Sequence, residues 1–271
     1  MHYRPEFEAA LHVCPKCNYH DRISASARIA LLLDEPDAFD ELDRDLTSSD
    51  PIEFERPAGP YRERVAKARA VTGRNEAIVC GVGRLDGRPL ALGVMEFDFI
   101  AGSMGAATGE KIARLFEHAR EHRLPLVIVT SSGGARQDEG LFALMQMGKT
   151  TAAATRLAAA GLPYICIMAD PTLAGVTASF AAVADVIIGE PGATIRFAGS
   201  RVVQGAMKRR RPVEDHTSEW VLRRGMIDLV VPRSLQKTTL SRLIGLMVPL
   251  RTEGRAARTA VPGVEVTRPS P

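Results

Sequence analysis

The hydrophobic and polar positions divide the chain into helices, short buried strands and loops. Ser24 precedes a stretch whose apolar residues recur at helical spacing, so we predict a helix over 24–33 with this hydroxyl as its N-cap. A second amphipathic helix is predicted over 61–71. The segment 36–60 between them contains four prolines and many acidic residues, which is typical of an irregular segment that wraps a core.

From Glu76 onward the pattern favours strands. Two apolar runs flank Asp86–Gly87, a pair that suits a type I′ turn, and together they predict a β-hairpin over 77–99. Buried strands then alternate with helices. We expect strands over 125–130, 163–169, 186–189 and 194–197, and helices over 106–122, 139–160, 176–183 and 235–248. This alternation predicts one α/β domain of stacked ββα or βαβ units.

Composition adds limits rather than new elements. The chain has 271 residues and is 45% hydrophobic, which is enough to close the core of one large domain. Its formal charge is only +3, so attraction of an anion would depend on local clusters. The opening residues lack an apolar signal segment, and no apolar run is long enough to cross a membrane. We therefore expect a cytoplasmic protein that does not bind membranes.

The most informative segment is VIVTSSGGARQDE at 127–139. A buried strand that ends in consecutive glycines shortly before a helix is expected to leave backbone N–H groups free at the positive end of the helix dipole. Two such amides directed at one oxygen form an oxyanion hole, so Gly133 and Gly134 are our candidate catalytic positions. A helix-entry turn of small residues and a phosphate cradle are the alternatives.

Two further loops share this character. Residues 170–180 follow the next strand and lead through small residues into a helix, while residues 101–106 connect the hairpin to its helix. All six histidines lie outside the three loops, and no glycine-flanked serine has an aspartate and a histidine nearby. A reaction in which backbone amides stabilise an enolate and the other reactant supplies the base fits this pattern better than side-chain nucleophilic catalysis.

Several short motifs follow one another in order. They are FIAGSMG at 99–105, SGGAR at 132–136, LMQMGKT at 144–150, GLPYI at 161–165, DPT at 170–172, VTASFA at 176–181, and FAG at 197–199 with RV at 201–202. In this order, from Cys14 to Leu250, the chain resembles the carboxyltransferase β subunits of biotin-dependent acetyl-CoA carboxylase.

The resemblance implies a crotonase-like fold of repeated ββα units over 23–251, after an incomplete zinc-ribbon-like segment over 1–22 and before a disordered tail over 252–271. It also implies transfer of a carboxyl group from carboxybiotin to acetyl-CoA or a related short acyl-CoA, giving malonyl-CoA. The ureido anion formed from carboxybiotin would take the α-proton of the thioester. The implied partners are a carboxyltransferase α subunit, a biotin carboxyl carrier protein and biotin carboxylase.

Carried over by position, Gly133 and Gly134 would hold the thioester oxyanion, and two other loops would wall the acyl-CoA and the junction with the partner. The substrate-binding candidates are Gly102, Ser103, Met104, Gly105, Ala135, Arg136, Gly175, Val176, Gly199 and Arg201. The chain departs from the family where Ala101 and Ala174 replace glycines and Ser200 replaces a proline. If residue 174 requires a positive φ, alanine there costs on the order of 1 kcal/mol.

A basic cluster of Arg201 and residues 208–211 is either a solvated face or a site that neutralises CoA phosphates. Nucleic-acid binding is less favoured, because aromatic residues are not interleaved with these basic ones.

Cys14 and Cys17 resemble one knuckle of a zinc ribbon, which needs four ligands. Either His12 or His20 contributes, another polypeptide supplies the missing ligands, or the pair is a metal-free remnant. Cys80 and Cys166 lie in apolar strand-like runs, which predicts small buried thiols.

Two other functions stay open from the sequence. One is a related decarboxylase subunit that acts on malonyl thioesters. The other is a catalytically weak scaffold or regulatory subunit, which the alanine-for-glycine departures and the half ribbon suggest.

Overall fold

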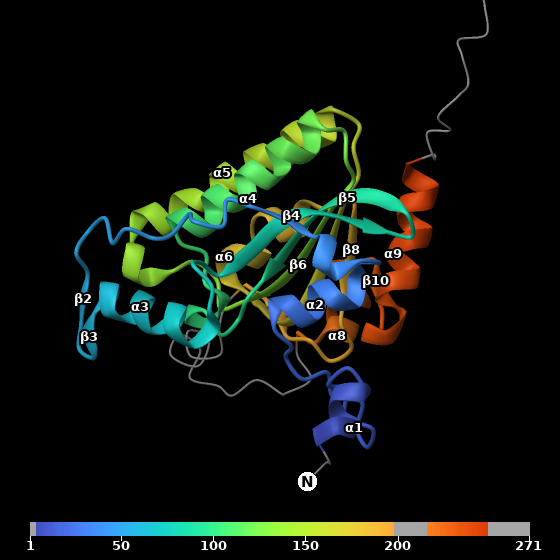
Figure 1. The fold of residues 1–271 in the computed structure, drawn as a ribbon, viewed down its shortest axis with the longest axis horizontal. Helices are drawn as coiled ribbons and strands as arrows, with labels where there is room; N and C mark the ends of the chain where they lie inside the picture. Colours follow the sequence, from blue (N-terminus) through green and yellow to red (C-terminus); the bar gives the residue numbers. More distant parts are fainter. Residues whose placement is uncertain (1–3, 198–215, 249–271) are drawn as a thin grey trace, which may run out of the picture.

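The structure is a computed structural model that describes residues 4–197 and 216–248 (Figure 1). Gly199, Arg201, the basic run 208–211 and the expected tail lie outside the described residues.

Eight strands of the described chain form the central sheet. Its order is β1 (Asp40–Leu42), β4 (Ile78–Leu85), β5 (Arg88–Met95), β6 (Leu126–Ser132), β7 (Tyr164–Leu173), β8 (Val186–Gly189) and β10 (Leu229–Val230), with β9 (Ile195–Arg196) paired to the end of β7. The pairs β1–β4 and β4–β5 are antiparallel, and the sheet is parallel from β5 onward. The carboxyl ends of β5, β6 and β7 therefore meet along one edge.

The hairpin is as predicted. Leu85 pairs with Arg88, and the two turn residues Asp86 and Gly87 have φ of 52° and 72°, as a type I′ turn requires.

Helices cover both faces of the sheet. Helices α4 (Ala106–Glu121) and α5 (Leu141–Ala159) run side by side over one face, and α2 (Ala25–Leu32) and α9 (Arg233–Met247) cover the other (Figure 1). Leu115, Phe116 and Leu157 are fully buried in the core on the first face, and Leu92, Ile165 and Leu240 in the core on the second. Strand residues packed on both faces explain the continuous apolar runs of the sequence.

The remaining elements are short, apart from α3 (Tyr61–Thr72), which was predicted. They are α1 (Arg4–Ala9), α6 (Ala174–Thr177), α8 (Ser218–Leu222), the two-residue strands β2 (Glu55–Arg56) and β3 (Gly59–Pro60), and the 3-10 turns η1 (Pro36–Ala38), η2 (Ile100–Gly102), η3 (Gln137–Glu139) and η4 (Phe180–Val183). The N-cap at Ser24 is confirmed, since its side chain accepts a hydrogen bond from the N–H of Ala27.

Several predicted elements have different boundaries. The helix expected over 139–160 begins at Leu141, after Gly140 with φ 52°. The helix expected over 176–183 is broken into α6 and η4 at Ser179, whose φ of −129° and ψ of −121° are not helical. Strand β7 runs on to Leu173 because Thr172 and Leu173 pair with β9.

In the part of the chain that the structure describes, no helix is long and apolar enough to span a membrane.

Candidate functional site

The three loops predicted from the sequence converge at the carboxyl edge of the sheet. The N–H of Met104 donates to the carbonyl of Gly134 at 2.8 Å, and the N–H of Arg136 donates to the carbonyl of Met104 at 2.9 Å. These bonds form a one-residue parallel bridge between Met104 and Ala135. The Ser132 hydroxyl also donates to the carbonyl of Gly102 at 2.6 Å. The first and second loops are therefore joined backbone to backbone.

The second loop also lies against the third. A Cβ added to Gly134 would come within 2.6 Å of the Ala174 Cβ, and one added to Gly175 would lie 3.2 Å from the Ala135 Cβ. Below them, the hydroxyls of Thr130 and Thr172 are 2.9 Å apart. Adjacent parallel strands thus bring residues 134–135 and 174–175 together.

The two amides predicted as oxyanion donors are already occupied. The N–H of Gly133 donates to the carbonyl of Ala101 at 2.9 Å, and that of Gly134 donates to the Ser132 hydroxyl at 3.0 Å. The expectation of free donors at these positions was wrong because no helix starts there. Helix α5 begins only at Leu141, so the glycine turn folds back onto its neighbours.

The available donors lie one residue further along each loop. In a parallel bridge the flanking residues of one strand make the hydrogen bonds, so the N–H of Ala135 points away from Met104. Gly175 is the second residue of α6, where no intrahelical acceptor exists. Neither N–H has a hydrogen-bond acceptor among the described residues. Two neighbouring free amides are the arrangement that an oxyanion hole needs.

Strained backbone surrounds these amides. Ala174 has φ 49°, Ala101 has φ 56° and Ile100 has φ 49°. Residue 174 does take a positive φ, so the condition stated above is met, and each such alanine costs on the order of 1 kcal/mol. Gly102, with φ 61°, packs so closely on the second loop that an added Cβ would collide with the carbonyl oxygen of Ser131.

Most predicted substrate-binding side chains are buried. Met104 and Val176 are fully enclosed in the core beneath the loops, and the Ser103 hydroxyl donates to the carbonyl of Ile100 at 2.7 Å. Gly105 is the N-cap of α4. These residues contribute backbone and support to the site, so their side chains do not contact a ligand in this arrangement.

Arg136, which was predicted as a substrate-binding residue, is also internal, so its side chain is not available at the surface. Its guanidinium is 0% exposed and lies 2.5 Å from Glu76 and 3.3 Å from Glu139. Burial alone would lower the pKa of Arg136, but the two carboxylates and Tyr61 hold it above its usual value. For Glu76 burial would raise the pKa, yet Arg136 holds it below its usual value. Sequence periodicity carried no signal for this cluster.

The cysteine pair forms a tight turn near the N-terminus. The N–H of Cys14 donates to the carbonyl of Tyr19, and the N–H of Asn18 to the carbonyl of Cys14, both at 2.8 Å. The backbone N–H of Cys17 lowers the pKa of the Cys14 thiol. In the described ranges no group of three or more His, Cys, Asp or Glu side chains is placed to hold a metal ion.

His20 cannot complete this site. Its Nδ1 lies 2.9 Å from the carbonyl of Asn18, and its Nε2 accepts from the N–H of Arg233 at 3.3 Å. Because both ring nitrogens are engaged, the alternative of His20 as a local zinc ligand is wrong. His12 is not placed to join the two thiols either, so among the described residues Cys14 and Cys17 stand as a half site. Cys80 and Cys166 are buried, as expected, and burial raises the pKa of each thiol to about 12.

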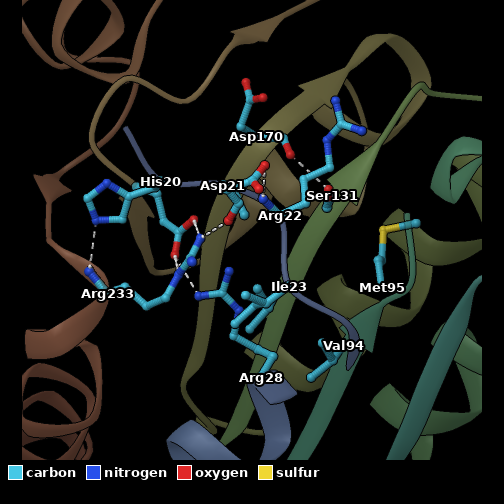
Figure 2. A pocket seen from close by; sticks show the side chains of 13 residues that line it. His20, Asp21, Arg22, Ile23, Arg28, Val94, Met95, Ser131, Asp170 and Arg233 are labelled. Carbon is cyan, nitrogen blue, oxygen red and sulfur yellow. Dashed lines mark hydrogen bonds and ion pairs between the residues drawn. The ribbon is translucent and has the colours of Figure 1, made fainter. Parts of the chain in front are cut away.

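The pocket beside the N-terminal segment is not a substrate site. Figure 2 shows it between His20, Arg28 and Arg233 on one side and Ser131 and Asp170 on the other, and it has room for about one water molecule. Glu190 lies beneath it, 2.9 Å from Arg233 and 2.5 Å from Arg28. This buried ion cluster fastens the N-terminal segment to α9, since Arg233 also donates to the carbonyls of Leu11 and Asp21.

Comparison with known proteins identifies the family of the chain. Residues 46–268 match the carboxyl transferase domain family. The chain belongs to this family. This carboxyl transferase chain is 44% identical over 245 residues to the acetyl-coenzyme A carboxylase carboxyl transferase subunit beta of Citrifermentans bemidjiense, covering 90% of this chain and 86% of that protein.

Other relatives give the same result. The subunit beta of Acaryochloris marina is 44% identical over 260 residues, covering 96% of this chain and 85% of that protein. The chloroplastic subunit beta of Solanum bulbocastanum is 44% identical over 247 residues, covering 91% of this chain and 50% of that protein. The carboxyl transferase chain thus spans half the length of its chloroplastic relatives.

Solved structures confirm the fold. Transcarboxylase 12S with methylmalonyl-coenzyme A and methylmalonic acid bound has a TM-score of 0.70 at 24% identity, over 83% of this chain and 41% of that one. The beta subunit of geranyl-CoA carboxylase from P. aeruginosa has a TM-score of 0.66 at 21% identity, over 91% and 41%. The expected crotonase-like fold is therefore confirmed, with β4, β5 and α4 as its complete ββα unit.

One more surface of this carboxyl transferase chain adjoins the loops. The first turns of α5, directly after Gly140, carry large apolar side chains that are between 49% and 69% exposed. These residues, called the α5 patch below, are Leu141, Phe142, Leu144 and Met145. A contiguous apolar group of this kind on a helix is typical of a protein interface. In the sequence, Leu144 and Met145 belong to the motif over 144–150, but nothing indicated that these side chains are exposed.

Proposed function

We propose that this chain is the acyl-CoA-binding subunit of a biotin-dependent carboxyltransferase, which carboxylates acetyl-CoA or a related short acyl-CoA to malonyl-CoA or its homologue. The observation that carries the proposal is the pair of free amides at Ala135 and Gly175, in a chain that is 44% identical to acetyl-coenzyme A carboxylase subunits over 90% of its length.

The chemistry follows from what these amides do. The N–H groups of Ala135 and Gly175 would donate to the thioester oxygen, and they would gain strength as that oxygen acquires charge in the enolate. Removal of one donor from such a hole typically costs about 3 kcal/mol. Carboxybiotin, brought on its carrier protein, would supply the carboxyl group and the base. This division of labour agrees with the absence of histidine from the three loops.

The partner subunit has a candidate docking surface. We propose that a carboxyltransferase α subunit covers the α5 patch, because this patch adjoins the second loop and an apolar surface next to the amides would exclude water from the reaction. Biotin carboxylase and the biotin carboxyl carrier protein are further proposed partners.

The proposal extends to zinc and to the location of the protein. Cys14 and Cys17 would supply two of the four thiolate ligands of a structural zinc site, with the others from another polypeptide. All four cysteines are reduced thiols, which suits the reducing environment of the cytosol.

The test is reconstitution with the α subunit, biotin carboxylase and the carrier protein. We expect malonyl-CoA to form from acetyl-CoA, and we expect Gly134→Val to abolish its formation while the complex still assembles. At φ 109°, with Ala174 Cβ 2.6 Å from an added Cβ, valine would displace the Ala135 amide. The proposal fails if no acyl-CoA-dependent transfer occurs while a reference complex is active.

The same assay separates the alternatives. Release of CO2 from a malonyl group on a carrier protein, without carboxylation of acetyl-CoA, would identify a decarboxylase subunit. Full activity of Gly134→Val would identify a scaffold whose loops take no part in the reaction.

A further inference from the structure

A buried charged cluster lies directly behind the free amide of Ala135. It consists of Glu76, Arg136 and Glu139, all 1% exposed or less, with the hydroxyls of Ser48 and Tyr61. Charged groups are rarely enclosed in this way without a specific purpose, because removing them from water is costly. An apolar core would support the loops at lower cost, so the position of the cluster calls for a physical reason.

Arg136 connects the first loop to the second. Its Nη2 donates to the carbonyl of Ser103 at 2.7 Å, and its Nε donates to the Ser103 hydroxyl at 3.2 Å. Its own backbone N–H closes the bridge to Met104. The carbonyl of Gly134 and the N–H of Arg136 both bond to Met104, so the peptide group that carries the Ala135 N–H is held between two fixed neighbours, one of which is Arg136.

Glu139 holds the other end of the second loop. Its Oε2 accepts from the N–H of Ala106 at 2.5 Å, at the start of α4, and its Oε1 accepts from the Tyr61 hydroxyl at 2.5 Å. Arg136 and Glu139 therefore act at both ends of a four-residue span. The span is fixed to α4, to the first loop and to α3.

The carboxylates of the cluster need hydrogen-bond donors besides the guanidinium. Two buried carboxylates, Glu76 and Glu139, face the single guanidinium of Arg136. The Ser48 hydroxyl lies 2.7 Å from Glu76 and 2.7 Å from Glu139 and accepts from Arg136 at 2.9 Å. Hydrogen bonds to charged groups are worth more than neutral ones, and a buried carboxylate that loses one is costly. Ser48 and Tyr61 are therefore integral to the cluster.

The two hydroxyls come from neighbouring parts of the chain. Ser48 lies in the irregular stretch between β1 and β2, and Tyr61 is the first residue of α3. Asp138 of the second loop also pairs with Arg56 of β2 at 2.9 Å and with Arg64 of α3 at 2.7 Å. The second loop is thus held both by the wrapping segment and by α3.

We propose that Arg136, held by Glu76 and Glu139 and completed by Ser48 and Tyr61, is the positioning residue that aligns the Ala135 amide with the Gly175 amide. The inference rests on the proposed function, in which those amides bind the enolate. Arg136 itself does not touch the substrate. It acts through the backbone of the residue before it.

The test uses Ser48, because serine allows a matched pair of variants. Ser48→Ala removes the hydroxyl, whereas Ser48→Thr retains it. In the reconstituted complex we expect kcat to fall about tenfold in Ser48→Ala, with KM for acetyl-CoA within about twofold of wild type, and Ser48→Thr to retain kcat. A misplacement of about 1 Å can cost a factor of about 100, so a partial loosening gives a smaller factor. Tyr61→Phe should behave like Ser48→Ala.

Hydrogen–deuterium exchange provides a readout that does not need activity. We expect faster exchange of the peptide covering 132–140 in Ser48→Ala than in Ser48→Thr. Ser241→Ala is the control and should exchange like the wild type in this peptide, because the Ser241 hydroxyl binds Asp86 in the hairpin turn and not the cluster. Unchanged exchange would overturn the inference even if the wild-type complex proves inactive. Faster exchange with unchanged kcat, or with kcat and KM altered together, would also overturn it, since the cluster would then be structural only.

Discussion

Ala101 and Ala174 both hold left-handed backbone conformations in loops whose relatives were expected to carry glycine. An L-residue in this region is strained by the contact between its Cβ and the following carbonyl oxygen. Ala101 lies in the first loop, three residues before Met104 of the bridge, and Ala174 immediately precedes Gly175. The chain thus tolerates a local cost at the positions that shape its site.

Replacing Ala174 with glycine should stabilise the protein. We expect Ala174→Gly to raise the free energy of unfolding by about 0.5–1 kcal/mol, because relief of the left-handed strain exceeds the entropic cost of glycine. Urea denaturation measures the change. Ala178→Gly is the control, since Ala178 has φ −83° and glycine there should destabilise. A loss of stability in Ala174→Gly would contradict the strain at this residue.

Two glycines of the site should be destabilised by alanine to different degrees. Gly102→Ala places a Cβ against the carbonyl oxygen of Ser131 at φ 61° and should cost about 2–3 kcal/mol. Gly133→Ala meets nothing closer than 3.5 Å and should cost less than about 1 kcal/mol. Thermal unfolding of both variants measures this difference, and equal stability would show that the first two loops pack differently.

On the proposed function, one oxyanion donor, Ala135, lies one residue beyond the predicted Gly134, whereas the other, Gly175, was expected only to line the junction with the partner. A strand followed by two glycines indicated a loop with free amides, but the acceptors of Gly133 and Gly134 are Ala101 and Ser132. Ala101 is more than thirty positions away and reaches Gly133 only because η2 folds over β6. No periodicity reports such a contact, so the shift to Ala135 and Gly175 required the structure.

At the scale of elements, the sequence predicted the turns, caps and helices that depend on neighbouring residues. The Asp86–Gly87 turn, the Ser24 cap and the amphipathic helices were all confirmed. Edge strand β1 was missed, because three residues within a proline-rich stretch carry no pattern and form a strand only by pairing with β4. The break between α6 and η4 was missed for a similar reason, since it follows the contacts of the third loop rather than its composition.

Glu190 gives the N-terminal segment a defined acid sensitivity. Burial alone would raise the pKa of Glu190, but Arg28 and Arg233 lower it to about 2, against an ordinary 4.5. Because the folded-state pKa is depressed, this stabilisation is complete above about pH 4.5 and is lost as the pH falls toward 2, by an amount of about 3 kcal/mol.

Urea denaturation between pH 5 and pH 2.5 tests this sensitivity. Glu190→Gln should be less stable by about 3–5 kcal/mol at pH 7, because it leaves two buried guanidinium groups uncompensated. Its stability should also change less with acid than that of the wild type. Parallel pH curves for the two proteins would show that Glu190 is not ionised in the folded state.

At the scale of the whole molecule, the two sides of the sheet have different surfaces. On the side of α4 and α5, the α5 patch adjoins the three loops, whereas α9 on the other side carries exposed apolar residues far from them (Figure 1). On the proposed function, the α subunit is expected to cover the side that carries the three loops. The exposed apolar residues of α9 therefore provide a control surface for testing where the partner binds.

A charge within the α5 patch should weaken assembly. We expect Leu144→Glu to reduce the affinity for the α subunit at least tenfold, because an apolar contact becomes a buried unpaired carboxylate. Leu246→Glu is the matched control, as Leu246 on α9 is 83% exposed and should leave binding unchanged. Analytical ultracentrifugation of the mixed subunits measures both. If Leu246→Glu alone weakened assembly, the partner would bind the opposite side.

The bridge between Met104 and Ala135 has a stereochemical consequence. Because the backbone ladder sets the direction of one donor and α6 sets the other, two fixed vectors define how a bound enolate is oriented. On the proposed function, such an enolate would expose the same face to the incoming carboxyl group in every turnover. A propionyl substrate would then yield a single enantiomer of the carboxylated product. Chiral chromatography of that product would test whether the bridge between Met104 and Ala135 holds its donor in one orientation.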